Sequence, residues 1–199
     1  MRKSQKAYLL FKRLLDIIIS IIGIFVCFAL LWWWIFIINL FVTKGHPFFR
    51  QKRYGHKKKV FNILKFRTMK LDADSNLPPS KMSGKEQYDM MTGFGHFLRK
   101  TQIDETLQLF NILIGQMSFV GPRPGAAINE DELVKAREQY SPNSYDVKPG
   151  LTGLSQIELK DKHNPLLKAE KDSWYVKNIS FGLDIKIFIK TLFYSFKKK

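Results

Sequence analysis

The segment with the clearest potential for chemistry is 99–105, which reads Arg-Lys-Thr-Gln-Ile-Asp-Glu. Asp104 and Glu105 are adjacent, and neighbouring residues on a helix point in partly different directions. One carboxylate could therefore attack a phosphate and form an acyl phosphate, while the other holds a metal or manages a proton. Mg²⁺ binds in this way, through one or two carboxylates and the phosphates of a substrate. Arg99 could hold phosphate oxygens in a bidentate manner.

The same side chains also have purely structural explanations. Acids in the first turn of a helix interact favourably with its dipole, and most Asp-Glu pairs do no more than that. Arg123 stands between two prolines, which fix the backbone and present the guanidinium to an anion with little loss of entropy. Lys148 precedes a Pro-Gly pair and has the same two explanations, an anion site or a turn whose cation pairs with an acid.

Other kinds of catalytic or metal site find little support in the sequence. The four histidines are scattered and have no zinc-like spacing with each other or with the single cysteine, Cys27. One cysteine also excludes an intrachain disulfide bond. The chain has no Walker A loop, no Rossmann glycine fingerprint and no Gly-x-Ser-x-Gly motif. The acidic pair is therefore the main candidate for chemistry.

The acidic pair lies in a segment with helical periodicity, 94–117. Apolar residues recur there at helical spacing, at Leu107, Phe110 and Ile114. Thr101 is the expected cap of this helix, and Gly115 is its expected end. The sequence therefore predicts that both carboxylates lie in the first turns of one helix.

The other segments after the apolar run predict a small domain of mixed structure. Partly alternating polarity predicts a short strand at 60–66, and Pro and Gly residues predict a loop at 70–92. Residues 129–140 have the pattern of a polar surface helix. Residues 179–196 form a basic amphipathic helix, which could lie in a membrane interface or pack on the domain core.

Residues 17–42 form an uncharged apolar run in which 23 of 26 residues are hydrophobic. A run longer than about 18 residues is typical of a membrane segment. It is also longer than the apolar core of a secretory signal peptide, which has about 7–15 residues. As a helix it would be about 39 Å long, against a hydrocarbon core of about 30 Å, so one tilted span would fit.

Basic residues flank this run on both sides. The chain has 33 Lys and Arg against 17 Asp and Glu, a net charge of +16, and residues 1–60 alone contribute +11. Lys and Arg favour the cytoplasmic side, so a re-entrant hairpin would keep both flanks there, beside anionic lipids. The bend of a hairpin must satisfy its backbone groups, and the middle of the run has neither Pro nor Gly. Charge favours the hairpin, and a single spanning helix is the alternative.

These patterns divide the chain into a membrane-anchoring segment, 1–44, and one domain, 45–199, that ends in the amphipathic helix. The second part is long enough for a core of its own. An aromatic content of 14% argues against disorder.

Taken in order along the chain, the motifs resemble those of the bacterial sugar transferase family, the monotopic phosphoglycosyl transferases. Any one match would be weak, but the ordered set covers nearly the whole chain. The matching segments are 11–16, 49–55, 61–69, 97–101, 104–105, 108–111, 115–124 and 148–153, followed by Asp172, Tyr175, Asn178, Ser180 and Asp184.

The resemblance implies a membrane-associated α/β fold at the cytoplasmic face of the bacterial inner (plasma) membrane. An N-terminal hydrophobic helix, re-entrant or spanning, would precede a compact, mostly helical cytoplasmic domain with a small sheet and interfacial amphipathic helices. The sequence departs from the family at the bend of the membrane helix, where Phe28-Ala29 stands in place of Ser-Pro. A Gly-Arg pair that often follows the 148–153 motif is also missing, although Gln156 remains.

The implied activity is transfer of a phospho-sugar from a UDP-sugar to undecaprenyl phosphate with release of UMP, as the first membrane step of glycan assembly. By carry-over, Asp104 is the nucleophile of a covalent ping-pong mechanism, and Glu105 assists a metal or the lipid phosphate. Asp104 and Glu105 would hold Mg²⁺. The residues expected to bind substrate are Arg99, Arg123, Lys65, Lys148 and Gln156, with Arg123 in the nucleotide-binding turn.

Two other functions compete with this one. The charge of residues 1–60 would also suit a non-enzymatic, membrane-anchored basic module that binds anionic lipid or nucleic acid. Nucleic-acid binding usually adds a reader or a stacking platform, and the sequence has neither, so no nucleic-acid partner is expected. A family member that has lost catalysis is disfavoured by the intact Asp104-Glu105 pair. The sequence names neither the sugar, nor the glycan pathway, nor the oligomeric state.

Overall fold

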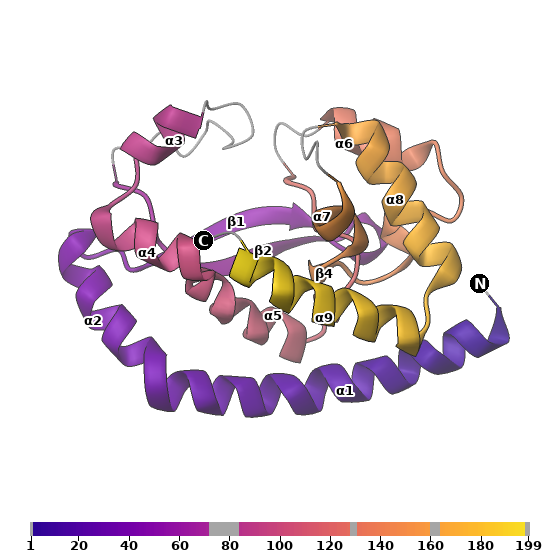
Figure 1. Ribbon diagram of the computed structural model, residues 1–199, viewed down its shortest axis with the longest axis horizontal. Coiled ribbons are helices and arrows are strands. Elements are labelled where there is room, and N and C mark those ends of the chain that lie inside the picture. The colour runs from indigo at the N-terminus through magenta and orange to yellow at the C-terminus, as the bar shows by residue number, and fades with distance from the viewer. Residues whose placement is uncertain (1, 72–83, 128–130, 160–163, 198–199) are drawn as a thin grey trace.

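The apolar run 17–42 and the basic residues before it form one long, bent helix of 40 residues, Lys3–Val42, in the computed structural model (Figure 1). It consists of α1 (Lys3–Cys27), a π-helical turn η1 (Phe28–Trp32) and α2 (Trp33–Val42). The structure describes residues 2–71, 84–127, 131–159 and 164–197. Within these ranges it contains one helix that is long and apolar enough to cross a membrane.

The elements that follow are short. They are β1 (Phe48–Tyr54), η2 (His56–Lys58), β2 (Val60–Phe66), α3 (Gly84–Asp89), α4 (Gly93–Thr101), η4 (Ile103–Leu107), α5 (Gln108–Leu113), β3 (Ser118–Val120), α6 (Asp131–Glu138), η5 (Ser144–Asp146), β4 (Gly150–Thr152), α7 (Leu154–Glu158), α8 (Pro165–Asn178) and α9 (Phe181–Lys197). The described part is mostly helical, as expected.

The long helix bends at the π-helical turn, which begins at Phe28. Figure 1 shows α2 turning away from the axis of α1 at this point. A π turn inserts an extra residue into the helical hydrogen-bond ladder, and such insertions kink helices. The bend therefore needs neither Pro nor Gly, and the turn that makes it includes Phe28-Ala29, the pair at which the sequence departs from the family it resembles. The chain stays helical through this bend. Whether the helix re-enters on the cytoplasmic side or spans the membrane stays a prediction.

One face of α1 carries a row of buried polar side chains that bind the domain. Gln5, Lys12, Asp16 and Ser20 are all buried. The Lys12 ammonium pairs with Asp184 of α9. The Asp16 carboxylate accepts hydrogen bonds of 3.1 Å from the Ser118 hydroxyl and from the Phe119 backbone N–H. Spacings of four and seven residues place this polar row on one side of the helix.

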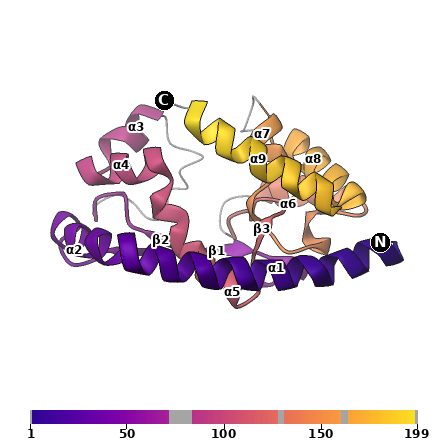
Figure 2. The same cartoon turned by 60° about the horizontal axis from the view of Figure 1, so that its bottom comes forward.

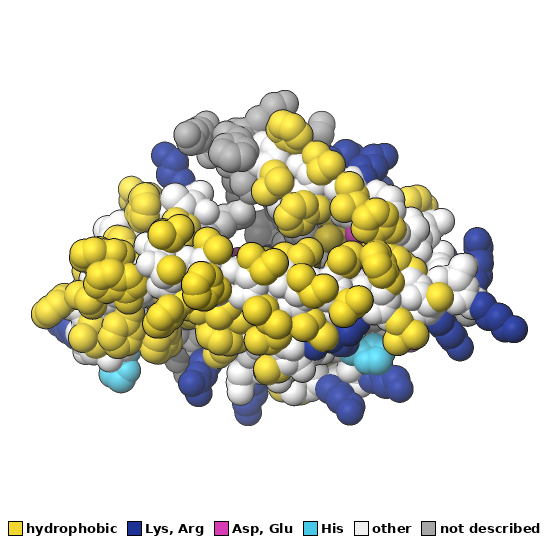
Figure 3. Space-filling view, turned by 90° about the horizontal axis from the view of Figure 1, so that it is seen from below, with side chains coloured by type: hydrophobic (Ala, Val, Ile, Leu, Met, Phe, Trp, Pro, Cys, Tyr) yellow, Lys and Arg dark blue, Asp and Glu magenta, His cyan; other side chains and the backbone are white. Residues whose placement is uncertain are grey.

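The opposite face of α1 is apolar and exposed, which reverses the pattern of an ordinary surface helix. The exposed large apolar side chains of α1 include Leu10, Phe11, Leu14, Ile18, Ile21, Ile22 and Phe25. On α9, the exposed apolar residues are Phe181, Ile185, Phe188, Ile189, Leu192 and Phe193. Figure 3 shows hydrophobic side chains covering most of this face, with Lys and Arg towards its edges. We call it the apolar face.

The sequence left open whether the C-terminal helix α9 packs on the domain core or presents an apolar surface that could lie in a membrane interface, and α9 does both. Ile187 is 1% exposed and packs with Tyr175 and Val176 of α8. Asp184 is also buried, and it accepts hydrogen bonds from Tyr8 at 2.6 Å and Tyr175 at 2.7 Å. One side of α9 therefore packs on the domain, and the other contributes to the apolar face. Figure 2 shows α9 and α1 from this side.

The expected small sheet is present as two separate pairs of strands. β1 and β2 pair antiparallel, from Phe48 opposite Phe66 to Tyr54 opposite Val60. β2 covers the predicted residues, Val60–Phe66. β3 and β4 pair in parallel, with Ser118 opposite Gly150 and Val120 opposite Thr152.

The predicted single helix over 94–117 is wrong, because the chain breaks it into three pieces. Gln102 adopts a left-handed conformation with φ +59°, which ends α4 and starts the tight turn η4. Thr92, and not Thr101, caps α4, since its hydroxyl accepts from the Gly95 N–H at 2.9 Å. Gly115, with φ +88°, does follow the end of α5. Part of the predicted loop 70–92 is the helix α3, and 72–83 lie outside the described residues.

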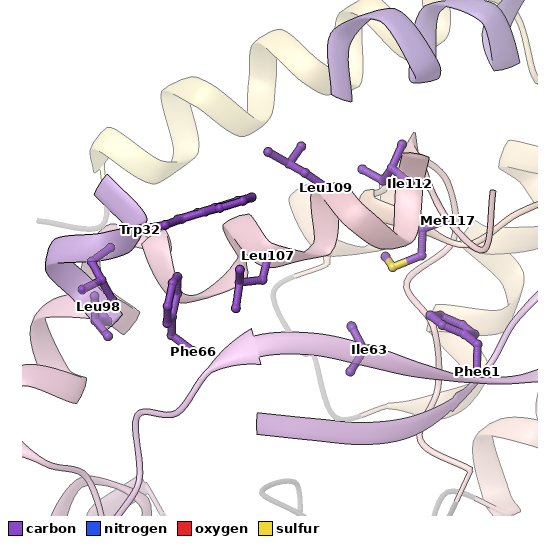
Figure 4. Packing of buried hydrophobic residues seen from close by; sticks show 10 residues of the cluster. Trp32, Phe61, Ile63, Phe66, Leu98, Leu107, Leu109, Ile112 and Met117 are labelled. Carbon is purple, nitrogen blue, oxygen red and sulfur yellow. The ribbon is translucent and has the colours of Figure 1, made fainter. Parts of the chain in front are cut away.

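The main core joins the long helix to the catalytic candidates. Trp32 and Ile35 are each 6% exposed and pack in one cluster with residues of β2, η4 and α5. Figure 4 shows Trp32, Phe66 and Leu107 close together in this cluster. The Trp32 indole N–H also donates to the Thr106 hydroxyl at 2.9 Å. The division into 1–44 and 45–199 stays a prediction, with the core shared between the two parts.

Candidate active site

The acidic pair lies on η4, the tight turn between α4 and α5. Asp104 is 5% exposed. The Glu105 carboxylate is held between two cations, with its Oε1 at 2.6 Å from Lys65 Nζ and 3.2 Å from Arg123 NH2. The three segments 60–66, 103–107 and 121–125, far apart in sequence, therefore meet at Glu105.

Lys65 reaches Glu105 because of its position on β2. Phe61 and Ile63 are buried on the face of β2 that meets the core, and Lys65 continues this alternation. A cation thus takes the third place in an otherwise apolar row. Burial lowers the pKa of the Lys65 ammonium, and the neighbouring Glu105 opposes that shift.

The two carboxylates have opposite pKa shifts. Burial raises the pKa of Asp104 to about 6, with Lys65 opposing and Glu105 adding to the shift. Burial would raise the pKa of Glu105 as well, but Arg123 and Lys65 outweigh it and lower the pKa to about 2. Glu105 is therefore an ionised, cation-bound group, whereas Asp104 is an acid whose charge is poorly compensated. Two adjacent carboxyl groups whose pKa values are shifted in opposite directions are typical of a functional site.

Asp104→Asn should make the metal-free and nucleotide-free protein more stable at neutral pH. The raised folded pKa means that wild-type stability declines as the pH rises from about 4 to about 6, because the unfolded state ionises first. Above this window the loss approaches roughly 3 kcal/mol. An Asn is neutral throughout, so we expect a gain of up to about that size at pH 7 and little change near pH 4.

Chemical denaturation of the two proteins at both pH values, with a chelator present, checks this expectation. The exposed Asp131→Asn provides a control, which should change little at either pH. Equal stability of Asp104→Asn and wild type at pH 7 would show that the Asp104 charge is compensated.

A cavity of about 580 Å³ opens beside Glu105, and we call it the Glu105 cavity. Arg123 and Gln156, two of the expected substrate-binding residues, also line it. Arg99 lies in the last turn of α4, where its charge lowers the pKa of Asp104 against the effect of burial. Lys65 and Arg123 therefore contact Glu105, Arg99 acts electrostatically on Asp104, and Gln156 shares the cavity with Glu105.

Lys148 lies elsewhere. It lines a different cavity of about 240 Å³, together with Arg13 and His56. A side chain added at Gly115 would place its Cβ 3.2 Å from both Lys148 Nζ and Arg13 NH2, so these two cations are near neighbours. The structure does not bring Lys148 to the Glu105 cavity, and its role in substrate binding stays a prediction.

The turn that carries Arg123 is locked against the 148–153 segment by close backbone contacts. The Gly121 N–H donates to the Thr152 carbonyl at 2.8 Å, and the Gly150 N–H donates to the Pro122 carbonyl at 2.9 Å. A Cβ on Gly150 would lie 2.1 Å from the Gly121 nitrogen, so only glycine permits this approach. The two glycine-proline motifs of the sequence are thus two halves of one structural unit.

Arg137 supports the same turn, and the sequence analysis missed it. Its NH2 donates to the Arg123 carbonyl at 2.8 Å and to Asp172 Oδ2 at 2.7 Å. The Ser155 hydroxyl donates to the other oxygen of Asp172 at 2.9 Å. Arg137 is 3% exposed and lies on the face of α6 that buries Leu133. A charged residue at helical spacing on a buried face was the signal in the sequence.

Asp104 and Glu105 could bind Mg²⁺ only if substrate phosphates and water supplied the other ligands. In the described ranges, no group of three or more His, Cys, Asp or Glu side chains is arranged to hold a metal. Mg²⁺ often takes just one or two carboxylates and completes its shell with substrate phosphates and water. Asp104 and Glu105, adjacent on η4, supply that donor chemistry.

Comparisons with known proteins show which family the chain belongs to. A family model described as "Bacterial sugar transferase" matches residues 7–198. The chain is 37% identical over 200 residues to a UDP-glucose:undecaprenyl-phosphate glucose-1-phosphate transferase of Klebsiella pneumoniae, covering 96% of this chain and 41% of that protein. It is 34% identical over 196 residues to an undecaprenyl-phosphate galactose phosphotransferase of Salmonella typhimurium, covering 90% and 39%.

Coverage differs among the relatives. The chain spans about two fifths of the length of these two transferases. It covers 86% of an uncharacterized sugar transferase, EpsL, of Bacillus subtilis, to which it is 37% identical over 187 residues. Because the family model covers nearly the whole sequence and several relatives exceed 30% identity, the chain belongs to the bacterial sugar transferase family.

Proposed function

We propose that this chain transfers a phospho-sugar from a UDP-sugar to undecaprenyl phosphate, giving undecaprenyl-diphosphate-sugar and UMP. The observation that carries the proposal is the buried carboxylate of Asp104, beside a Glu105 already bound by Lys65 and Arg123 at the edge of a cavity. The names of the relatives support the choice of substrates, since they include UDP-glucose and undecaprenyl phosphate.

In the first step, an Asp104 carboxylate oxygen attacks the phosphorus that bears the sugar. The bond from this phosphorus to the bridging oxygen of the diphosphate breaks, and UMP leaves with the electron pair. The product is an acyl phosphate that joins the sugar phosphate to Asp104. Ionised Asp104 is required, and its partial desolvation makes the carboxylate a more reactive group than one held by cations.

In the second step, a phosphate oxygen of undecaprenyl phosphate attacks the same phosphorus. The bond between this phosphorus and the Asp104 oxygen breaks, which restores the carboxylate and completes the diphosphate. One site can therefore serve two large substrates in turn, with ping-pong kinetics.

The surrounding charges would hold the phosphates in place. Arg123, on its fixed turn, and Arg99 would bind the anionic oxygens of the nucleotide sugar, and Gln156 would contact the same substrate from α7. Lys65 and Glu105 would orient one another at the reacting phosphorus. When bound by Asp104, Glu105 and substrate phosphates, Mg²⁺ would neutralise charge on the diphosphate.

The proposed location is the cytoplasmic face of the bacterial inner membrane, with the long helix re-entrant. Gln5, near the start of the helix, donates to the Lys177 carbonyl at 2.8 Å, and Asn39, near its end, donates to the Arg67 carbonyl at 2.9 Å. A span would carry one end about 30 Å away from the domain. Bonds at both ends therefore favour a helix that lies in one leaflet, with the apolar face in lipid and the basic edges at anionic headgroups.

A UMP-release assay tests the function. Purified protein with undecaprenyl phosphate and Mg²⁺ is offered a panel of UDP-sugars that includes UDP-glucose and UDP-galactose. Release of UMP with at least one sugar, dependent on both substrates and lost on chelation, is expected. No release with any sugar, together with salt-sensitive binding to anionic vesicles, would favour the non-enzymatic basic module instead.

A further inference from the structure

A second cavity, of about 480 Å³, lies beneath the bend of the long helix, and we call it the Trp32 cavity. Its volume is within the range of small-molecule sites, about 300–1,000 Å³. Trp32 and Phe36 of the bent helix line it from one side. Leu64 and Lys65 of β2 line it from the other.

The Trp32 cavity is apolar except at two points. Aromatic side chains form much of its lining, and two of their ring contacts join Phe36 to Phe48 at 5.6 Å and Trp32 to Phe110 at 5.2 Å. Its charged lining residues in the described structure are Arg50, which is exposed, and Lys65. A hydrocarbon chain with an anionic end would match this lining, with the chain against the apolar side chains and the anion beside a cation.

Lys65 connects this cavity with the catalytic candidates. Lys65 lines the Trp32 cavity, and its ammonium lies 2.6 Å from Glu105, which lines the Glu105 cavity. An ammonium has three N–H donors, and Glu105 accepts one of them. A phosphate that entered along the Trp32 cavity would therefore reach Lys65 beside Asp104.

The bend of the long helix contacts the turn η4, which carries the acidic pair. Trp32, the last residue of the π turn, is 6% exposed, and its indole N–H donates to the hydroxyl of Thr106, the residue after Glu105. Phe28, the first residue of this turn, and Phe36, four residues after its end, line the cavity and are also exposed on the surface. The cavity is therefore bordered by exposed apolar side chains of the long helix and by Lys65, which pairs with Glu105.

We propose that the Trp32 cavity binds the first isoprenoid units of the lipid phosphate acceptor and that Lys65 receives its phosphate. The inference rests on the proposed function. It assigns the two substrates to different entrances, with the nucleotide sugar in the Glu105 cavity and the lipid in the Trp32 cavity. Lys65 is then the residue through which the second substrate reaches the phosphorylated Asp104.

The test separates the two half-reactions in the full-length protein. Exchange of labelled UMP into UDP-sugar, without acceptor, measures the first half, and UMP release against undecaprenyl phosphate concentration measures the whole. Leu64→Trp would fill the cavity, and Trp is well tolerated in strands. We expect it to raise the KM for undecaprenyl phosphate about tenfold, with a much smaller change in UMP exchange.

Phe36→Ala provides a milder variant, because this side chain is 38% exposed at the mouth of the cavity. Its matched control is Phe41→Ala on the same helix α2, which is 78% exposed and does not line the cavity. We expect the KM for undecaprenyl phosphate to rise about threefold for Phe36→Ala and to change less than twofold for Phe41→Ala.

The outcomes distinguish the inference from the proposed function. Absence of both UMP exchange and UMP release in the wild type would overturn the proposed function. If the wild type is active and a folded Leu64→Trp protein keeps the wild-type acceptor KM, the acceptor does not use this cavity. Equal loss of exchange and transfer would also overturn the inference, since it would indicate a structural lipid or general distortion of the site.

Discussion

Asp104→Asn should abolish formation of the covalent intermediate and lower turnover by roughly 10⁴-fold or more. The amide has nearly the shape of the carboxylate but no anionic oxygen to attack phosphorus, so the acyl phosphate cannot form. Incubation with a UDP-sugar labelled in the sugar should label wild-type protein and leave Asp104→Asn unlabelled. UMP exchange, which needs only the first step, should be lost to the same extent as full transfer.

Glu105→Gln is the matched control for this result. Glu105 is bound by Lys65 and Arg123, so its replacement removes a charge that orients these cations and leaves the nucleophile in place. We expect slower turnover, by about 10²-fold, with the covalent intermediate still detectable. Labelling that persists in Asp104→Asn and disappears in Glu105→Gln would reverse the two assignments.

The stability of Asp104→Asn makes this experiment easier to interpret. Loss of activity through unfolding would be accompanied by lower stability, whereas the buried and poorly compensated charge predicts higher stability at neutral pH. An inactive protein that is as stable as wild type, or more so, would place the defect in the chemistry. The site would then be one where activity is maintained at the expense of stability.

Asp172→Ala should lower the free energy of unfolding by about 3–5 kcal/mol. Asp172 and Arg137 are 1% and 3% exposed, and the substitution leaves the Arg137 guanidinium buried without its carboxylate. The Ser155 hydroxyl loses its acceptor as well. Chemical denaturation in detergent measures the change.

Lys171→Ala is the control on the same helix α8. Its ammonium pairs with Glu158 at 3.1 Å, but its side chain is 40% exposed. Exposed pairs contribute only about 0–1 kcal/mol, so we expect almost no change. A similar loss in both variants would mean that burial does not set the strength of the Arg137–Asp172 pair.

A double variant separates stability from positioning. Arg137→Met with Asp172→Leu removes both charges together, and apolar replacement of a buried pair is often neutral or stabilising. We expect it to recover most of the stability lost in Asp172→Ala. The double variant lacks the hydrogen bond from Arg137 to the Arg123 carbonyl, so we expect the KM for the UDP-sugar to rise although stability recovers. Recovery of the wild-type KM would show that Arg137 does not position the turn.

Much of the chain could be predicted from sequence because local patterns determine it. The alternation over 60–66 predicted the strand β2, and the apolar run predicted the long helix. Both patterns depend only on residues close together in the sequence. The ordered motifs gave the family, which the family model confirms over residues 7–198. They also pointed to the acidic pair, although its catalytic role stays a proposal.

Interactions between distant segments could not be predicted in this way. The break at Gln102 was missed, because a single left-handed residue divides a periodic pattern without changing it. Arg137 was missed because it acts through two hydrogen bonds, to the Arg123 carbonyl and to Asp172, that form only in the folded protein. The placement of Lys148 away from Glu105 is also a property of the fold alone.

The sequence by itself determined that this protein has an uncharged apolar helix, a basic surround and an Asp-Glu pair in a family-specific setting. Composition and spacing along the chain suffice for the helix and the basic surround, and the resemblance of the ordered motifs to the family gives the setting of the acidic pair. Only the tertiary structure decided that the helix bends at Phe28, that its polar row faces the domain, and that Lys65 joins two cavities at Glu105. These features depend on which distant side chains pack together, and burial then changes the pKa of Asp104 and of Lys65.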